Sequence, residues 1–270
     1  MSVDTELCHR LQGAPNFEGA PNFRDLGGYT TRDGSRVRRG RLFRSQSLAS
    51  LTDADVELLH ALGVQLVCDL RSDGERRRSP NRLHPQFGGE RLEIGIDADL
   101  RANGNPFLAA IAADPTPAAA RRVMLSIYGD LPQAFATIWP SLIDGLLERQ
   151  RFPAVIHCTA GKDRTGFACA LLLLALDVPR DEVYRDYLRT RELFPAEPAA
   201  RDLHAAFAGR SEQALPLEAM LPFATVETDY LDAALTAIER DHGGVDRYLS
   251  DVAGLDAARR GRLRELLVEG

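Results

Sequence analysis

The feature that most limits the possible folds of this sequence is an alternation of short apolar runs with longer helix-like segments. Val64–Leu70 and Pro153–His157 are rich in β-branched residues and have the length of buried strands. Thr165–Leu176 is almost wholly apolar and is long enough for a buried helix. Because strands separated by helices usually pair in parallel, we expect an α/β fold with a central sheet and flanking helices.

Local signals predict several further elements. Thr52 can cap a helix over Leu51–Leu62, and Gly63 is suited to end it. Arg91–Ile96 is another strand candidate, whereas 71–90 is typical of a polar loop. Apolar periodicity predicts additional helices over 117–128, 132–149, 181–193, about 225–241 and 255–268.

Composition favours one folded domain over 1–270, with 44% hydrophobic and 27% charged residues among the 270. The net charge of −6 argues against a general nucleic-acid binder, which usually carries a basic surface. The longest uncharged apolar run, Phe167–Leu176, is too short to span a bilayer, so we expect no stable membrane insertion.

The termini and cysteines bear on location and on metals. The first ten residues do not resemble a secretory signal, so we expect a cytoplasmic protein or one exported without a recognisable signal peptide. None of the four cysteines forms a C-x-x-C pair, which argues against a zinc site. Cys68 and Cys169 lie in apolar segments and are expected to be core residues.

One stretch carries the chemistry: Val155–Gly166, which reads VIHCTAGKDRTG. A strand leads into a tight loop and the loop into a helix, with Cys158 and Arg164 at the two ends of the loop. Backbone N–H groups of such a loop can form a nest for an anion at the helix N-terminus, and this nest also favours the Cys158 thiolate. Arg164 offers a planar fork for two phosphate oxygens. A nucleophile and a clamp facing one anion predict phosphoryl transfer without a metal or cofactor.

The pattern C-x5-R, preceded by His and followed by Thr, resembles the cysteine-dependent protein tyrosine phosphatases. The string HCTAGKDRTG is similar to a bacterial and fungal branch that includes the mycobacterial phosphatase B group. Blocks elsewhere resemble the same branch, from about residue 20 to 268: NFRDLGGY at 22–29, LFRS at 42–45, DLRS at 69–72 and LRELL at 263–267.

This resemblance implies a role for each loop residue. Cys158 is the nucleophile and Arg164 the clamp, while the hydroxyl of Thr165 stabilises the thiolate that leaves when the phosphocysteine breaks down. His157 is expected to orient the loop by bonding nearby backbone. The remaining expected phosphate- or substrate-binding residues are Thr159, Ala160, Gly161, Lys162 and Gly166.

The proton donor for the leaving group has two candidates. Trp139 precedes a proline but no aspartate, and its surroundings are helical, so we expect it to pack inside a helix rather than in a Trp-Pro-Asp loop. Asp163 lies inside the loop, and Asp69 lies at the carboxyl end of a predicted strand, where catalytic residues often sit. The resemblance favours Asp163, with Asp69 as a supporting or alternate acid.

Other charged residues are expected to support the loop or flank it. Arg24, Asp25, Arg44 and Arg71 are predicted to form a buried network beneath it. The run Glu75–Arg82 is typical of a solvated segment, and it would attract anionic substrates if it bordered the pocket.

We therefore expect a cysteine-phosphatase-like domain with a catalytic core over about 20–193 and C-terminal helices over 225–270. Residues 194–224, apolar but interrupted by prolines, are predicted to form a mobile helical lid, the alternative being a permanently packed helical pair. The expected substrate is a phosphotyrosine protein, with dual specificity and a phosphoinositide as alternatives. The alternative of another class is a catalytically silent phospho-binding module.

Overall fold

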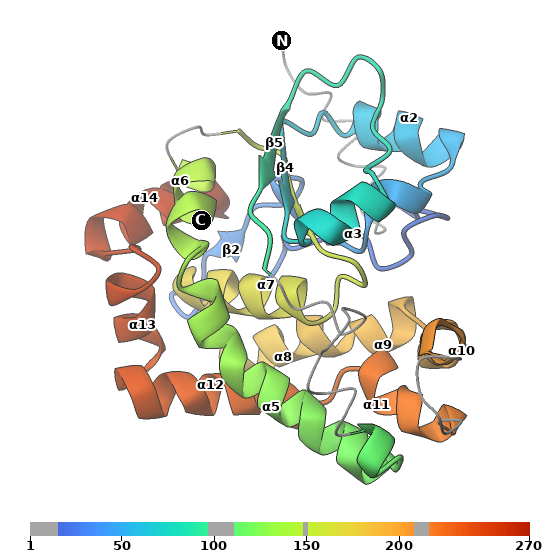
Figure 1. Cartoon of the computed structure of the whole chain (residues 1–270). Coiled ribbons are helices and arrows are strands. Elements are labelled where there is room, and N and C mark those ends of the chain that lie inside the picture. Colours follow the sequence, from blue (N-terminus) through green and yellow to red (C-terminus); the bar gives the residue numbers. More distant parts are fainter. Residues whose placement is uncertain (1–15, 97–110, 148–150, 208–215) are drawn as a thin grey trace.

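A five-stranded sheet lies at the centre of the computed structural model (Figure 1), which describes residues 16–96, 111–147, 151–207 and 216–270. Its strands follow the order β1 (Arg24–Asp25), β3 (Leu42–Ser45), β6 (Ala154–His157), β4 (Leu66–Asp69) and β5 (Glu90–Glu93). β1 is antiparallel to β3, and the other neighbours pair in parallel. A separate short pair joins β2 (Arg36–Val37) to β7 (Val268–Glu269). The predicted α/β class is confirmed.

Most of the remaining regular structure is helical, and most of the helices follow β6 in sequence. They are α2 (Asp53–Ala61), α3 (Asp73–Arg78), α5 (Pro117–Phe135), α6 (Trp139–Leu147), α7 (Arg164–Ala175), α8 (Arg180–Leu188), α9 (Thr190–Leu193), α10 (Ala196–Phe207), α11 (Leu221–Ala224), α12 (Thr228–His242), α13 (Val245–Asp251) and α14 (Ala257–Leu267), with 3₁₀ turns η1 (Leu48–Ser50) and η2 (Leu217–Met220). Within the described ranges, no helix is both long and apolar enough to cross a bilayer.

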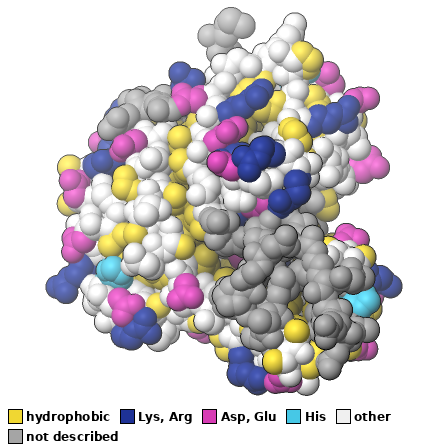
Figure 2. All heavy atoms as spheres, in the orientation of Figure 1, with side chains coloured by type: hydrophobic (Ala, Val, Ile, Leu, Met, Phe, Trp, Pro, Cys, Tyr) yellow, Lys and Arg dark blue, Asp and Glu magenta, His cyan; other side chains and the backbone are white. Residues whose placement is uncertain are grey.

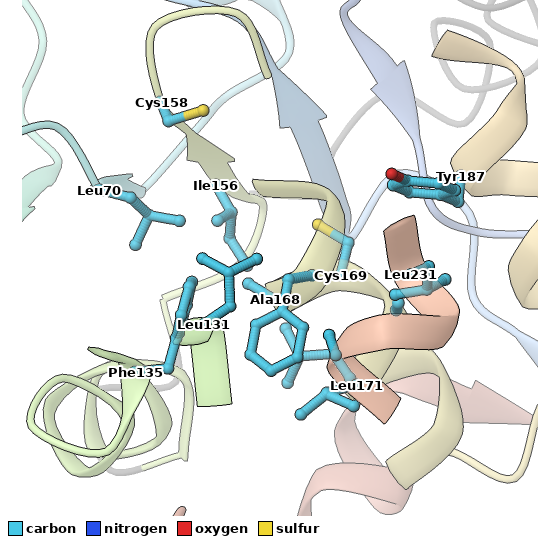
Figure 3. Packing of buried hydrophobic residues seen from close by; sticks show 14 of the residues in the cluster. Leu70, Leu131, Phe135, Ile156, Cys158, Ala168, Cys169, Leu171, Tyr187 and Leu231 are labelled. Atoms are coloured by element: carbon cyan, nitrogen blue, oxygen red, sulfur yellow. The ribbon is translucent and has the colours of Figure 1, made fainter. Parts of the chain in front are cut away.

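The two faces of the sheet bury different side chains, because successive strand residues point to opposite sides. Val67 and Val155 pack in the cluster that also contains Leu59 of α2. Cys68 and Ile156, their neighbours in sequence, belong to the larger cluster on the other face. Figure 3 shows side chains of this larger cluster, among them Ile156 of β6, Leu131 and Phe135 of α5, and Ala168 and Leu171 of α7. The central strands β3, β4 and β6 are therefore buried on both faces, and their ends are left open for a site.

The signals at α2 act as predicted. The Thr52 side chain accepts the Asp55 backbone N–H, and the Asp55 side chain accepts the Thr52 backbone N–H, which forms a complete capping box. Gly63 follows the helix with a φ of 66°, the left-handed conformation that glycine adopts without steric cost.

The structure differs from the expected helices at several points. Residues 73–78, assigned to a loop, form α3, which Ser72 and Glu75 cap in the same way. The helices expected over 117–128 and 132–149 are instead α5, which continues through Pro132 to Phe135, and α6. Proline removes one helical hydrogen bond, but α5 is held by its long contact with α12, and the Tyr248 hydroxyl bonds the Pro132 carbonyl at 2.7 Å. Helix α13 was not expected.

Candidate active site

The central strand β6 delivers Cys158 to the edge of the sheet where parallel strands end. Ser45 of β3 and Asp69 of β4 both pair with His157, the last residue of β6. The loop 158–163 then leads into α7. A cavity of about 250 Å³ lies against this loop. Its walls include Cys158, Thr159, Ala160, Lys162, Asp163 and Arg164 from the predicted site, together with Glu75, Met124, Ile127, Leu131, Phe194, Ala199, Asp202, Leu203, Phe223 and Ala224.

The loop meets the N-terminus of α7 without a side-chain cap. Asp163 occupies the N-cap position, but its side chain bonds none of the first backbone N–H groups of the helix. Such unpaired N–H groups, together with the helix dipole, favour an anion at that end. The Cys158 side chain is only 2% exposed and lies at the start of this loop, so an anion in the cavity faces both the thiol and the helix end.

Gly161 allows the loop to lie against the neighbouring strand. Its φ is 67°, and a Cβ at this position would be 2.4 Å from the Ser45 carbonyl oxygen. Asn22 holds the same part of the loop, because its side-chain amide donates to the carbonyls of Ala160 and Gly161 at 3.0 and 3.2 Å. The loop shape thus depends on contacts with β3 and the N-terminal segment.

A buried ionic network supports the loop from below, as predicted for Arg24 and Arg44. Arg44 donates to the Gly161 carbonyl at 2.7 Å and to Asp186 at 2.7 Å, and Arg24 contacts the other oxygen of Asp186 at 2.9 Å. Burial opposes the charge of Asp186, but the two arginines outweigh it and lower the pKa of this carboxyl. Asp25 does not join this network. It accepts the backbone N–H groups of Gly27 and Gly40 instead, at 2.7 and 2.8 Å.

Glu75 is a site residue that sequence reasoning missed. Its carboxylate accepts two bonds from Arg164, at 2.7 and 2.8 Å, and also bonds the Thr159 hydroxyl. Burial opposes its charge, but Arg164 outweighs it and lowers the pKa of Glu75 to about 2. In turn, burial opposes the charge of Arg164, and Glu75 keeps the pKa of Arg164 above its ordinary value.

A sequence signal for Glu75 was available. Ser72-x-x-Glu75 is a capping box, and it predicts a helix that starts just after β4. The positive residues of the same run lie on the surface, and Figure 2 shows basic side chains over the region of α3. Two of these residues pair with local acids, Arg76 with Asp73 and Arg82 with Asp53.

Asp163 and Lys162 contact each other inside the cavity. The Lys162 ammonium lies 2.8 Å from Oδ1 and 2.7 Å from Oδ2 of Asp163. The Tyr128 hydroxyl of α5 donates to Oδ1 at 2.7 Å, and the Tyr187 hydroxyl of α8 donates to Tyr128 at 2.7 Å. The carboxyl therefore has two direct partners, Lys162 from the loop and Tyr128 from α5, and Tyr187 of α8 bonds Tyr128 behind it.

Asp69 lies beneath the loop, outside the cavity wall. It is 1% exposed and forms an ion pair with Arg71, whose Nη2 is 2.7 Å from Oδ2. Burial opposes its charge, and the bonds from Arg71 lower the pKa of Asp69. His157 is 3.5 Å from Asp69, and its Nδ1 is 3.3 Å from the Cys158 carbonyl. Burial lowers the pKa of His157 to about 4, which makes it a neutral ring beside the loop backbone.

Thr165 and Gly166 stand in the first turn of α7, behind the cavity wall. The Thr165 hydroxyl is buried and bonds no described protein atom. A Cβ on Gly166 would lie 3.0 Å from the Tyr187 ring. Cys68 and Cys169 are buried in the core, as predicted, and burial raises the pKa of Cys169 to about 12. Trp139 packs inside the fold, where its indole donates to the Tyr248 hydroxyl at 2.9 Å.

The segment predicted as a lid contributes walls to the cavity. Phe194, which caps the end of α9, Leu203 of α10 and Phe223 of α11 all line it. α10 packs on α11 and η2, and its described side chains are mostly exposed or half-buried. Residues 208–215 of this segment lie outside the described residues.

Comparison with known proteins gives one family. The profile of the tyrosine phosphatase family matches residues 15–269. A Cupriavidus necator protein, provisionally named as a tyrosine-protein phosphatase, is 36% identical over 90% of this chain and 85% of its own length. The triple specificity protein phosphatase PtpB of Mycobacterium tuberculosis is 32% identical over 90% of this chain and 97% of its own. A tyrosine-protein phosphatase of Nostoc commune is 28% identical over 77% of this chain and 68% of its own.

These matches span the central sheet, the Cys158 loop and the C-terminal helices, and they agree with a site built to hold a phosphoryl group. The substrates of such an enzyme are phosphorylated molecules. The chain belongs to the tyrosine phosphatase family and is a phosphatase-type hydrolase.

Proposed function

We propose that this chain hydrolyses phosphotyrosine in proteins through a phosphocysteine intermediate. The observation that carries the proposal is the placement of Cys158 and Arg164 at the two ends of one loop, on the wall of one cavity, beside an uncapped helix N-terminus. The Cys158 thiolate attacks phosphorus, so an S–P bond forms and the bond to the phenol oxygen breaks. Arg164 and the loop N–H groups stabilise the charge on the equatorial phosphate oxygens.

Asp163 is the proposed general acid. It gives its proton to the departing phenol oxygen and then takes a proton from the water that cleaves the S–P bond, which releases phosphate and restores Cys158. In the unliganded site Lys162 binds both carboxylate oxygens. A bound phosphate dianion attracts Lys162 as well, and this attraction frees one Asp163 oxygen to hold the proton. The buried Thr165 hydroxyl, which has no described protein partner, supports the proposed role in stabilising the leaving thiolate.

The cavity walls favour an aromatic leaving group. Met124, Ile127 and Leu131 of α5 face the phosphate loop from one side, and Phe194 and Phe223 add aromatic surface. A phenyl ring gains free energy on leaving water for such a surface, whereas the short polar carbon of phosphoserine gains little. A broader range, including phosphoserine and phosphoinositides, is the second candidate, favoured by the cationic Lys162 in the cavity and by the name of the mycobacterial relative.

A substitution series tests the mechanism. Cys158→Ser is expected to keep affinity for vanadate, a phosphate analogue, and to lose turnover almost completely. Asp163→Asn is expected to lose about 10²–10⁴-fold on phosphotyrosine and far less on an aryl phosphate with an acidic leaving group, because protonation matters only when the leaving group is basic. Asp69→Asn is expected to lose activity on both substrates alike.

Other outcomes assign the function differently. Full activity of Cys158→Ser, or activity that a chelator abolishes, contradicts the phosphocysteine route. If Asp69→Asn loses activity on phosphotyrosine but not on the aryl phosphate with an acidic leaving group, and Asp163→Asn does not, Asp69 is the acid. Tight phosphopeptide binding without turnover of any substrate in the panel identifies a silent phospho-binding module. Phosphoinositide turnover that exceeds phosphotyrosine turnover identifies the lipid enzyme.

A further inference from the structure

A chain of two buried tyrosines from separate helices ends on the Asp163 carboxyl, which Tyr128 bonds directly and Tyr187 reaches through Tyr128. Tyr128 stands on α5 and Tyr187 on α8, far apart in sequence, and both side chains are almost fully buried. Their hydroxyls and Asp163 Oδ1 form a chain with two steps of 2.7 Å each. Neither tyrosine appears on the cavity wall, so neither hydroxyl is placed to touch a substrate.

The direction of this chain follows from counting protons. A carboxylate has no proton to donate, so the bond between Tyr128 and Asp163 uses the single hydroxyl proton of Tyr128. The Tyr128 oxygen therefore accepts from Tyr187. If Tyr128 instead donated to Tyr187, the Tyr187 hydroxyl proton would need another acceptor, and no described residue accepts it. Burial raises the pKa of both tyrosines well above 10, which keeps the two donors protonated.

The other partner of Asp163 cannot select between its oxygens. The Lys162 ammonium lies at nearly equal distances from Oδ1 and Oδ2 and stands on a flexible stem. The Tyr128 ring, in contrast, is fixed by packing, with the ring of Tyr230 5.5 Å away and that of Tyr187 edge-on at 6.4 Å. Of the two partners of Asp163, Tyr128 alone bonds one carboxyl oxygen, Oδ1, and not the other.

We propose that Tyr128, oriented by Tyr187, is a positioning residue that binds Asp163 through Oδ1 and so leaves Oδ2 as the oxygen that carries the proton to the leaving group. The inference rests on the proposed role of Asp163 as general acid. A proton on Oδ1 would have to share that oxygen with the Tyr128 donor, whereas Oδ2 is free once Lys162 moves to the phosphate. Tyr128 thus acts on the protonation step and not on phosphate binding.

The test is Tyr128→Phe, which removes the hydroxyl and keeps the ring packing. We expect kcat on phosphotyrosine to fall about tenfold, with KM and vanadate affinity within about twofold of the parent. On an aryl phosphate with an acidic leaving group, kcat should change less than about twofold. In an Asp163→Asn background, adding Tyr128→Phe should change kcat less than about twofold, because residues that act through one group are not additive. Tyr187→Phe should show the same selectivity with a smaller loss.

The matched control is Tyr184→Phe, on the same helix α8, whose hydroxyl bonds Asp232 away from the cavity. It should leave both activities unchanged. Equal losses of Tyr128→Phe on both substrates, or a loss that persists in the Asp163→Asn background, would overturn the inference and assign Tyr128 a structural role. If Tyr128→Phe does not fold, the absence of a selective loss in Tyr187→Phe overturns it. If Asp163→Asn itself shows no selective loss, the proposed acid has failed, and not merely its positioning.

Discussion

Replacing Glu75 with glutamine tests whether the buried carboxylate stabilises the fold through its charge. The substitution keeps the size of the side chain and one acceptor oxygen. It removes the negative charge of the carboxylate, whose Oε2 and Oε1 accept from Arg164 Nη1 and Nη2 at 2.7 and 2.8 Å. Oε1 also accepts from the Thr159 hydroxyl. The Glu75 residue is only 4% exposed, so solvent screens this pair weakly.

The pKa of Glu75 sets the magnitude. Burial alone would raise it, but Arg164 lowers it from the ordinary 4.5 to about 2. A carboxyl whose pKa falls on folding stabilises the protein above its unfolded pKa and loses that contribution as the pH falls toward its folded pKa. The difference of about 2.5 pH units corresponds to about 3 kcal/mol at pH 7 and about 1 kcal/mol at pH 3. Glu75→Gln should therefore lower the free energy of unfolding by about those amounts.

Urea unfolding of both proteins between pH 7 and pH 3 measures this difference. His157, whose pKa is about 4, also destabilises the fold as the pH falls, but it is present in both proteins and cancels in the comparison. Glu93→Gln is the control, because the exposed Glu93 side chain is 3.5 Å from Arg76 and should matter by less than about 0.5 kcal/mol. A loss in Glu75→Gln that stays constant from pH 7 to pH 3 would refute the electrostatic reasoning.

Two further predictions concern the loop and the segment above it. Gly161→Ala should lower the free energy of unfolding by about 1–3 kcal/mol and kcat/KM by more than tenfold, because the new Cβ meets the Ser45 carbonyl and the φ of 67° is unfavourable. The control is Gly34→Ala, where φ is 88° but the space around the Cβ is open, so it should lose stability and keep its activity. An equal loss of activity in Gly34→Ala would contradict the steric argument. If residues 194–224 form a mobile lid, backbone hydrogen exchange in α10 should be faster than in β6 and should slow when vanadate binds. Equal protection of both elements with and without vanadate favours a permanently packed helical pair.

The sequence predicted the loop and three strands of the sheet, near β4, β5 and β6, because these follow local rules, but it did not predict β1 and β3. The predicted strands near β4 and β6 each have an uninterrupted apolar centre, Leu66–Cys68 and Ala154–Ile156, which a strand buried on both faces requires. The loop motif is local too, since its ends and its glycine fall within nine residues. Where prediction failed, tertiary packing outweighed a local signal: α5 runs through Pro132 because contacts with α12 and Tyr248 hold it.

Partners contributed from distant segments could not be predicted. Glu75, which bonds Arg164, comes from α3. Tyr128, which bonds Asp163, comes from α5, and Tyr187, which bonds Tyr128, comes from α8. Glu75 stood within a basic run that resembles an exposed segment, and its capping signal says where a helix starts but not what its third residue faces. Nothing in the sequence near Tyr128 distinguishes it from an ordinary core tyrosine of an amphipathic helix.

The contacts of Asp69 support the proposal that Asp163, and not Asp69, is the general acid. Asp69 ends β4 beside the end of β6, as the sequence suggested, but its oxygens bond Arg71 and Asn81 beneath the loop. Asn81 also lies 3.3 Å from the His157 ring, which contacts the Cys158 carbonyl. A carboxyl whose pKa is lowered by a fixed cation holds a proton poorly, so it suits the support of His157 better than proton transfer. Asp163, next to a lysine that a bound phosphate can attract, has the partner that substrate binding can change.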